Sequence, residues 1–294
     1  KYEYGTLMET IIEAINKRVS VRSYNDEPIV QENKKKIMDL LDSTNKGPFG
    51  HQVRFVLIDF SEVDKKEVRS LGTYGFISGA KSFIVSAIKD GLEETDSEKA
   101  FVDLGYCFEK IILTATNLGL GTCWMGGTFK RANFAKSINA SEDELVPAIS
   151  PIGYARDRRT VREIALRRFA NSDHRKPWKD LFFDGSMVTP LSKESAGNYT
   201  VPLECVRLGP SASNNQPWRL VYQRQPKAFH FYLKRTPGYN RFNGKMDLQL
   251  IDMGISMCHF ELSAREKGLA GTWEVAKPYL DTGDAEYIAT WKES

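Results

Sequence analysis

A loop of small polar residues in the last third of the chain carries the clearest chemistry. Residues 209–218 read Gly-Pro-Ser-Ala-Ser-Asn-Asn-Gln-Pro-Trp. The first two residues end any preceding helix, and the proline before Trp218 can open a strand. Ser211, Ser213 and Asn214 offer hydroxyl and amide groups with little bulk, so the backbone can approach a ligand closely. Trp218 is expected in the core, and an ordinary turn before a strand is the alternative interpretation.

A second candidate segment follows an amphipathic helix that the apolar spacing predicts at about residues 6–17. In an extended chain, Arg18, Ser20 and Arg22 point to one side and Val19 points to the other. Two guanidinium groups and a hydroxyl on one side suit a phosphate group. The same pattern also occurs on exposed strands that bind nothing.

A third candidate segment follows a long apolar helix predicted over residues 103–118. It consists of Trp124, Met125, Gly126 and Gly127. Paired glycines remove side chains and leave backbone N–H groups free to face a ligand. A helix end followed by a glycine turn is the alternative.

Together these segments resemble the FMN-dependent nitroreductase family. The loop at 209–218 is similar to the family's Pro-Ser-Ser-x-Asn-x-Gln-Pro-Trp segment, and Arg18-x-Ser20-x-Arg22 is similar to its Arg-x-Ser-x-Arg/Lys segment. The resemblance implies an α+β nitroreductase-like fold, with mixed or antiparallel sheets flanked by helices. In that family the fold is a homodimer, and the serine loop reaches the flavin bound mainly by the other subunit.

The resemblance also implies roles for individual residues. Arg18 and Ser20 would hold the FMN phosphate, Arg22 would lie near the flavin ring, and a backbone N–H of the glycine segment would lie near flavin N5. Arg175 resembles the arginine of a late basic element that touches the phosphate, although Asp173 stands at the upstream basic position. The full set of implied cofactor-binding residues is Arg18, Val19, Ser20, Arg22, Trp124, Met125, Gly126, Gly127, Arg175, Pro210, Ser211, Ala212, Ser213 and Asn214.

The sequence contains an internal repeat. Asp252–Trp273 matches Asp103–Trp124 without a gap, from Asp-x-Gly at the start to Gly-Leu-x-x-x-Trp at the end. Long-period self-similarity indicates a duplicated unit. We predict that residues 1–178 and 179–294 are two nitroreductase-like halves, fused as an intramolecular pseudo-dimer with the two central helices near a pseudo-twofold axis.

The two halves retain complementary motifs. The first half keeps the arginine segment and the glycine pair, but residues 47–55 are a worn copy of the serine loop. The second half keeps the intact loop, yet residues 183–186 hold no arginine and residues 273–275 lack the glycine pair. One complete set of motifs therefore predicts one FMN per chain and, since the dimer-like interface is internal, a monomer.

Composition narrows the class of protein. The net charge of +3 is too mild to indicate a nucleic-acid partner or an anionic membrane surface. The sequence contains no run of eighteen or more apolar residues, so no membrane-spanning helix is predicted. The four cysteines and four histidines show no metal-ligand spacing, so we expect no metal site, and the apolar neighbours of the cysteines favour reduced thiols in a cytoplasmic protein.

The activity that the resemblance implies is NAD(P)H oxidation. NADH or NADPH would give a hydride to flavin N5, and the reduced flavin would then reduce a nitroaromatic, a quinone or a similar small molecule. This double displacement needs no protein nucleophile, so no catalytic side chain is predicted. Two alternatives remain: another flavin reaction such as dehalogenation or flavin breakdown, and flavin binding or sensing without turnover.

Overall fold

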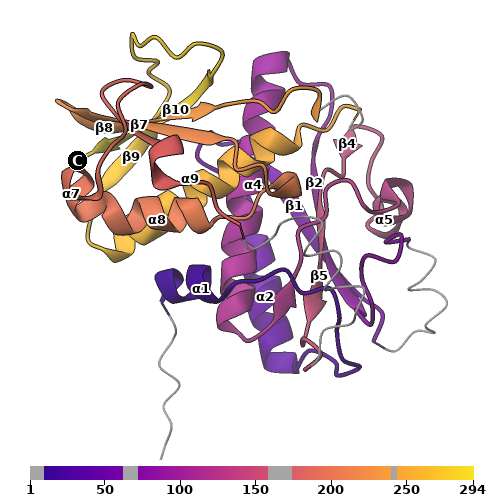
Figure 1. Ribbon diagram of the computed structural model, residues 1–294. Coiled ribbons are helices and arrows are strands. Elements are labelled where there is room, and N and C mark those ends of the chain that lie inside the picture. The colour runs from indigo at the N-terminus through magenta and orange to yellow at the C-terminus, as the bar shows by residue number, and fades with distance from the viewer. Residues whose placement is uncertain (1–9, 62–71, 158–173, 240–243) are drawn as a thin grey trace, which may run out of the picture.

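The computed structural model describes residues 10–61, 72–157, 174–239 and 244–294 (Figure 1). Its α-helices are α1 (Ile11–Lys17), α2 (Gln31–Ser43), α4 (Glu94–Asn117), α5 (Arg131–Ser137), α7 (Lys193–Ala196), α8 (Thr200–Leu208) and α9 (Leu248–Glu266). Its strands are β1 (Val53–Asp59), β2 (Ser82–Lys89), β3 (Gly121–Thr122), β4 (Glu144–Leu145), β5 (Ile149–Gly153), β6 (Phe182–Asp184), β7 (Trp218–Arg224), β8 (Lys227–Leu233), β9 (Gly271–Glu274) and β10 (Glu286–Glu293). Helices and antiparallel strands thus form an α+β fold, as predicted.

The first sheet has the strand order β1-β2-β5-β3, with β4 paired to β2, and all its pairings are antiparallel. Because successive side chains of a strand point to opposite faces, β2 is buried on both. Ile84 packs in the cluster that contains Ile37 of α2 and Phe108 of α4, whereas Phe83 packs with Phe134 of α5. This explains why residues 82–88 form a continuous apolar run in the sequence.

The second sheet has the order β6-β7-β8-β10-β9. Only the β6–β7 pairing is parallel among these strands, with Phe182 opposite Leu220. Helices α8 and α9 contribute to the apolar layer beneath it, where Phe260 of α9 packs against Phe231 and Trp291. Trp218, the last residue of the serine loop, is fully buried, so its predicted place in the core is confirmed.

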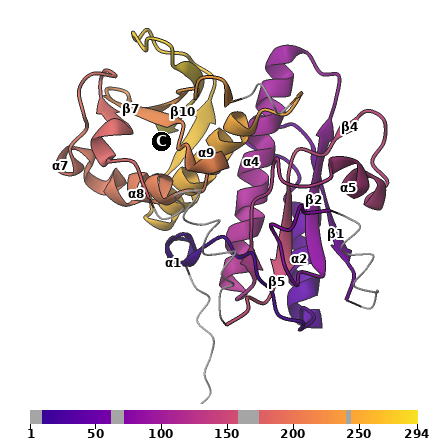
Figure 2. The same cartoon turned by 45° about the vertical axis from the view of Figure 1, so that its right-hand side comes forward.

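Helices α4 and α9 pack against each other between the two sheets (Figure 2). Gly105 of α4 faces the carbonyl of Ile251, and Gly254 of α9 faces the carbonyl of Val102; a Cβ on either glycine would overlap that oxygen. Gly254 follows Gly105 by the same number of residues as Ile251 follows Val102, so the contact between the helices is reciprocal. The prediction that the two central helices pack together is therefore confirmed.

The predicted boundaries differ from the structure mainly at helix starts. Helix α4 begins at Glu94, not at the predicted residue 103, because its first turns carry acidic residues that hide the apolar periodicity. Helix α1 begins at Ile11, where Thr10 and Glu13 form a reciprocal capping box. The earlier part of the predicted 6–17 helix lies outside the described residues, except for Thr10 itself.

Two further features bear on the class of protein. Over the described ranges, no helix combines the length and apolar character that a membrane crossing requires. Cys107, Cys123, Cys205 and Cys258 are all buried, and none of them forms a disulfide. Burial raises the pKa of the Cys107 thiol to about 12 and that of Cys205 to about 11, so both stay protonated at neutral pH.

Candidate functional site

The serine loop, residues 209–218, joins the end of α8 to the start of β7. Ser213, Asn214 and Gln216 have positive φ angles of 50°, 56° and 47°, in the left-handed region that non-glycine residues seldom adopt. Such a backbone persists only where its surroundings determine it. One restraint lies within the loop, since Ser211 Oγ accepts the N–H of Gln216 at 2.9 Å.

Asp252 of α9 holds the same loop from the side of the central helices. Its Oδ1 accepts the Ala212 N–H at 2.8 Å, and burial raises the pKa of the carboxyl well above its usual range although that bond opposes the shift. Asp103 of α4 does the same for the worn copy of the loop, accepting the N–H groups of Phe49 at 2.9 Å and His51 at 2.8 Å. The two aspartates are aligned in the predicted repeat, but this role was not predicted for either of them.

The segment that begins at residue 174 binds the serine loop from its outer side. Arg175 Nη2 donates to the Leu208 carbonyl at 3.1 Å, and Nη1 reaches Asn214 Oδ1 at 3.4 Å. The Lys176 N–H donates to Gln216 Oε1 at 2.7 Å. Arg175 and Asn214 are therefore brought together, as the resemblance implied. Gln216 is almost fully buried, which makes it a structural part of the loop.

The arginine segment leaves α1 and runs along the beginning of β3. Ser20 pairs with Thr122 in a parallel bridge, so the arginine segment lies beside the residues that immediately precede Trp124 in the chain. Arg18, Ser20 and Arg22 are half-buried, whereas Val19 is 42% exposed. Within the described part of the chain, the buried Nη1 of Arg22 has no hydrogen-bond acceptor. A buried guanidinium nitrogen without an acceptor is costly, and a ligand oxygen would satisfy it.

The glycine segment, residues 124–127, lies at the edge of the first sheet. Met125 exchanges backbone hydrogen bonds with Ile149, and the Gly126 carbonyl accepts from Arg131 Nη2 at 2.6 Å. A Cβ on Gly126 would lie 2.6 Å from Cδ2 of Leu248, the first residue of α9. A side chain there would have to displace that leucine, which explains the glycine; Gly127, next in the chain, is exposed.

Helix α9 brings the glycine segment and the serine loop together. Leu248 touches Gly126, and Asp252, one helical turn later, binds Ala212. The arginine segment adjoins the chain just before the glycine segment, since Ser20 pairs with Thr122, whereas α1 before it binds Glu266 at the far end of α9. Pro210 is two residues beyond the end of α8. Two segments that are far apart in sequence, the glycine segment and the serine loop, therefore meet at the first turns of α9.

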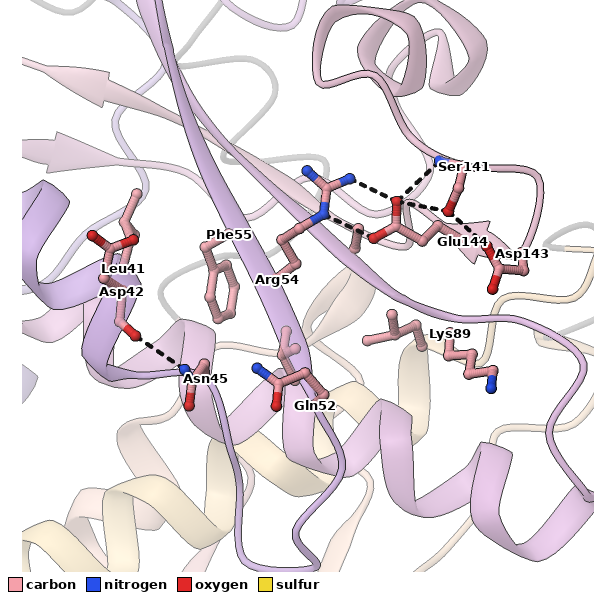
Figure 3. Close-up of a pocket in the computed structure, with 13 residues that line it drawn as sticks. Leu41, Asp42, Asn45, Gln52, Arg54, Phe55, Lys89, Ser141, Asp143 and Glu144 are labelled. Atoms are coloured by element: carbon pink, nitrogen blue, oxygen red, sulfur yellow. Dashed lines mark hydrogen bonds and ion pairs between the residues drawn. The ribbon is translucent and has the colours of Figure 1, made fainter.

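A cavity of about 450 Å³ lies elsewhere, at the end of β1 and β2 that faces β4 (Figure 3). Arg54 points across it and binds Glu144 through two hydrogen bonds of 2.8 and 2.6 Å. The lining residues are Leu41, Asp42, Asn45, Gln52, Val53, Arg54, Phe55, Ala87, Ile88, Lys89, Ser141, Asp143 and Glu144. None of them belongs to the predicted cofactor-binding set, so this cavity is distinct from the candidate site.

Another cavity, of about 410 Å³, lies where the repeat places the counterpart of the candidate site. Phe49 and His51 of the worn loop line it from one side, and Trp273 and Glu274 line it from the other. His51 is held by Asp103, at 3.2 Å from its Nδ1 to Oδ2. Phe49 and His51 are larger than the small residues of the serine loop, so this cavity has a different lining.

Comparison with known proteins identifies what this arrangement is similar to. A protein-family model described as "Putative TM nitroreductase" matches residues 10–264. The chain is 25% identical over 179 residues to a "Putative NADH dehydrogenase/NAD(P)H nitroreductase" of Archaeoglobus fulgidus, covering 58% of this chain and 100% of that protein. It is 27% identical over 136 residues to the "FMN reductase (NAD(P)H)" of Bacillus subtilis, covering 40% of this chain and 55% of that protein.

A solved structure shares the architecture. The crystal structure of a putative nitroreductase from Thermotoga maritima aligns over 100% of this chain and 97% of its own, with a TM-score of 0.60 and 21% identity. At that identity the likeness concerns the fold alone. It supports the nitroreductase-like α+β architecture described above.

Proposed function

The chain belongs to the nitroreductase family described as "Putative TM nitroreductase", and on this premise we propose that it is an FMN-dependent NAD(P)H oxidoreductase. The relatives named above, an NAD(P)H nitroreductase and an FMN reductase, support the cofactor pair. The substrate would be a small molecule such as a nitroaromatic or a quinone.

One observation carries the proposal: the serine loop and the glycine segment meet on the first turns of α9. Gly126 packs against Leu248, and Ala212 is bound by Asp252. Each segment alone could be an ordinary turn, but their meeting is the combination that the family resemblance implies for a flavin site. The arginine segment adjoins them through Ser20, which pairs with Thr122, two residues before the glycine segment.

The residues present fit FMN. The buried Nη1 of Arg22 and the buried Nδ2 of Asn215 both lack an acceptor among the described residues, and the flavin pyrimidine edge and ribityl chain offer acceptors. Arg18, Ser20 and Arg175 would hold the phosphate by charge-assisted hydrogen bonds. Removing any of these donors weakens binding without touching the reacting atoms.

The chemistry divides between cofactor and protein. When bound, FMN supplies hydride transfer between NAD(P)H and the acceptor. The protein would bind and orient it: Leu248 occupies the space where a Gly126 side chain would lie, and the Gly126 carbonyl is fixed by Arg131. Asp252 restrains Ala212, so the loop needs little reordering when FMN binds.

We further propose that the two halves, about residues 1–178 and 179–294, form an internal pseudo-dimer with one FMN site. The reciprocal contacts of Gly105 and Gly254, and the matching roles of Asp103 and Asp252, support a pseudo-twofold relation between the halves. The counterpart site has Phe49 where the intact loop has small residues. One interface within one chain favours a monomer.

Flavin content tests the proposal first. The purified protein is saturated with FMN and freed of excess, and the flavin released by heat is quantified per chain. We expect about one FMN per chain, and two would refute the single composite site. NADH and NADPH oxidation is then measured with a quinone and a nitroaromatic. One tightly bound FMN without NAD(P)H oxidation would indicate a flavin-binding role and overturn the enzyme assignment.

A further inference from the structure

A buried hydrogen-bond chain lies directly behind the glycine segment. Trp124 Nε1 donates to Glu109 Oε2 at 2.6 Å, and Glu109 Oε1 lies 2.8 Å from His259 Nε2. His259 Nδ1 lies 2.8 Å from the Cys205 carbonyl oxygen. The side chains of Glu109 and His259 are both fully inaccessible to solvent.

The chemistry of the partners fixes the direction of this chain. A carbonyl oxygen can only accept, so His259 Nδ1 carries a proton. An indole N–H can only donate, so Glu109 Oε2 accepts. One further proton lies between Glu109 Oε1 and His259 Nε2. Every polar atom of the chain is then satisfied, which suits a rigid, fully enclosed network.

The chain connects the two parts of the candidate site. Glu109 lies on α4, His259 on α9, and Trp124 begins the glycine segment. Cys205 lies on α8, four residues before Gly209 begins the serine loop. Movement of Glu109 would therefore shift the segment supplied by the first half relative to the loop supplied by the second.

The equivalent tryptophan of the repeat is held differently. Trp273 Nε1 donates to Glu261 Oε2 at 2.7 Å, and the same oxygen accepts the Tyr106 hydroxyl at 2.8 Å. The other oxygen of Glu261 pairs with Arg265, whose side chain is 52% exposed. The enclosed histidine–carboxylate pair thus binds Trp124, the tryptophan that precedes the glycine pair. The carboxylate that binds Trp273 is instead paired with an exposed arginine.

We infer that Glu109 is a positioning residue for the flavin site: through the Trp124 indole it sets the place of the Gly126 backbone. This inference rests on the proposed FMN site. It extends that proposal to a residue that does not touch the cofactor. The matching interaction of Glu261, with Trp273 and with Tyr106 of α4, contributes to packing and lies before no glycine pair.

The experiment compares Glu109→Ala, Glu109→Gln and the matched control Glu261→Ala, each titrated with FMN while flavin absorbance is recorded. We expect Glu109→Ala to raise the FMN dissociation constant about tenfold and to change the absorption band of the bound flavin. Glu109→Gln should restore both, because an amide can accept from Trp124 and donate to a neutral His259. Glu261→Ala should leave both as in the unchanged protein, even where it lowers thermal stability.

A second pair covers the case in which Glu109→Ala does not fold. Trp124→Phe and Trp273→Phe each remove one indole N–H and retain an aromatic ring, and only the former should weaken FMN. Equal effects of the paired substitutions, or unchanged FMN binding in the Glu109 and Trp124 variants, would overturn the inference while the FMN site stands. Failure of the unchanged protein to bind FMN would instead refute the proposed function, and this inference with it.

Discussion

Replacing Gly105 with alanine tests the helix crossing at the centre of the molecule. Intrinsic helix propensity alone favours alanine over glycine by about 1 kcal/mol, so an unobstructed helix would gain stability. Here the added Cβ would meet the carbonyl of Ile251, which is backbone and cannot rotate away. Overpacking costs about 1–3 kcal/mol, and a backbone obstacle places the cost near the upper value. The net expectation is a loss of about 2 kcal/mol.

Urea unfolding followed by circular dichroism measures this change. With a slope of about 3 kcal/mol per molar, the midpoint should fall by about 0.7 M. Gly254→Ala is the matched variant, because its Cβ meets the carbonyl of Val102, and it should show a similar loss. The double variant should lose less than the sum, since helices already displaced by one methyl accommodate the second more easily. An increase in stability for Gly105→Ala would refute the close crossing.

Three further outcomes are expected. Arg18→Ala should weaken FMN binding by about 1.5–3 kcal/mol through loss of a charge-assisted phosphate contact, and an unchanged titration would contradict the phosphate role. Burial raises the pKa of Asp252 in the folded state, so the stability that this carboxyl contributes is complete below its unfolded-state pKa and declines as pH rises through its folded-state pKa. The urea midpoints at pH 5 and pH 8 should therefore differ less in Asp252→Asn than in the unchanged protein. Identical pH dependence in both proteins would contradict the raised pKa of Asp252. The Arg54 hydrogen bond lowers the pKa of Glu144, so the stability that this pair contributes is present above the unfolded-state pKa of Glu144 and declines as pH falls through its folded-state pKa. Glu144→Gln should therefore lower the free energy of unfolding by about 0.5–1 kcal/mol at pH 7 and by less at pH 3. An equal loss at both pH values would contradict the lowered pKa of Glu144.

Much of the fold was predictable because the apolar patterns are strong. The buried run at residues 82–88 and the long apolar helices follow from periodicity, and the repeat indicated that α4 and α9 pair. The start of α4 was predicted wrongly because its first turns are polar and extend beyond the core. Periodicity reports burial, and it therefore loses a helix where the helix leaves the core.

The candidate site was predictable to the level of segments. Sequence motifs identified the serine loop, and the structure shows Asn214 bound to Arg175. The roles of Asp252 and Glu109 were not predicted, since each depends on contacts with residues distant in sequence. Asp252 binds Ala212, and Glu109 binds both Trp124 and His259. A buried carboxylate gives no local signal of its partner, although the repeat did align Asp252 with Asp103.

The crossing of α4 and α9 also has a consequence for synthesis on the ribosome. The first sheet can pair as soon as residues 53–153 have emerged, but the face of α4 that receives α9 has no cover until residue 266 is made. At typical elongation rates this delay is on the order of ten seconds. During that time the apolar side of α4 is open to solvent, so the nascent first half should be a client of chaperones that bind exposed apolar helices.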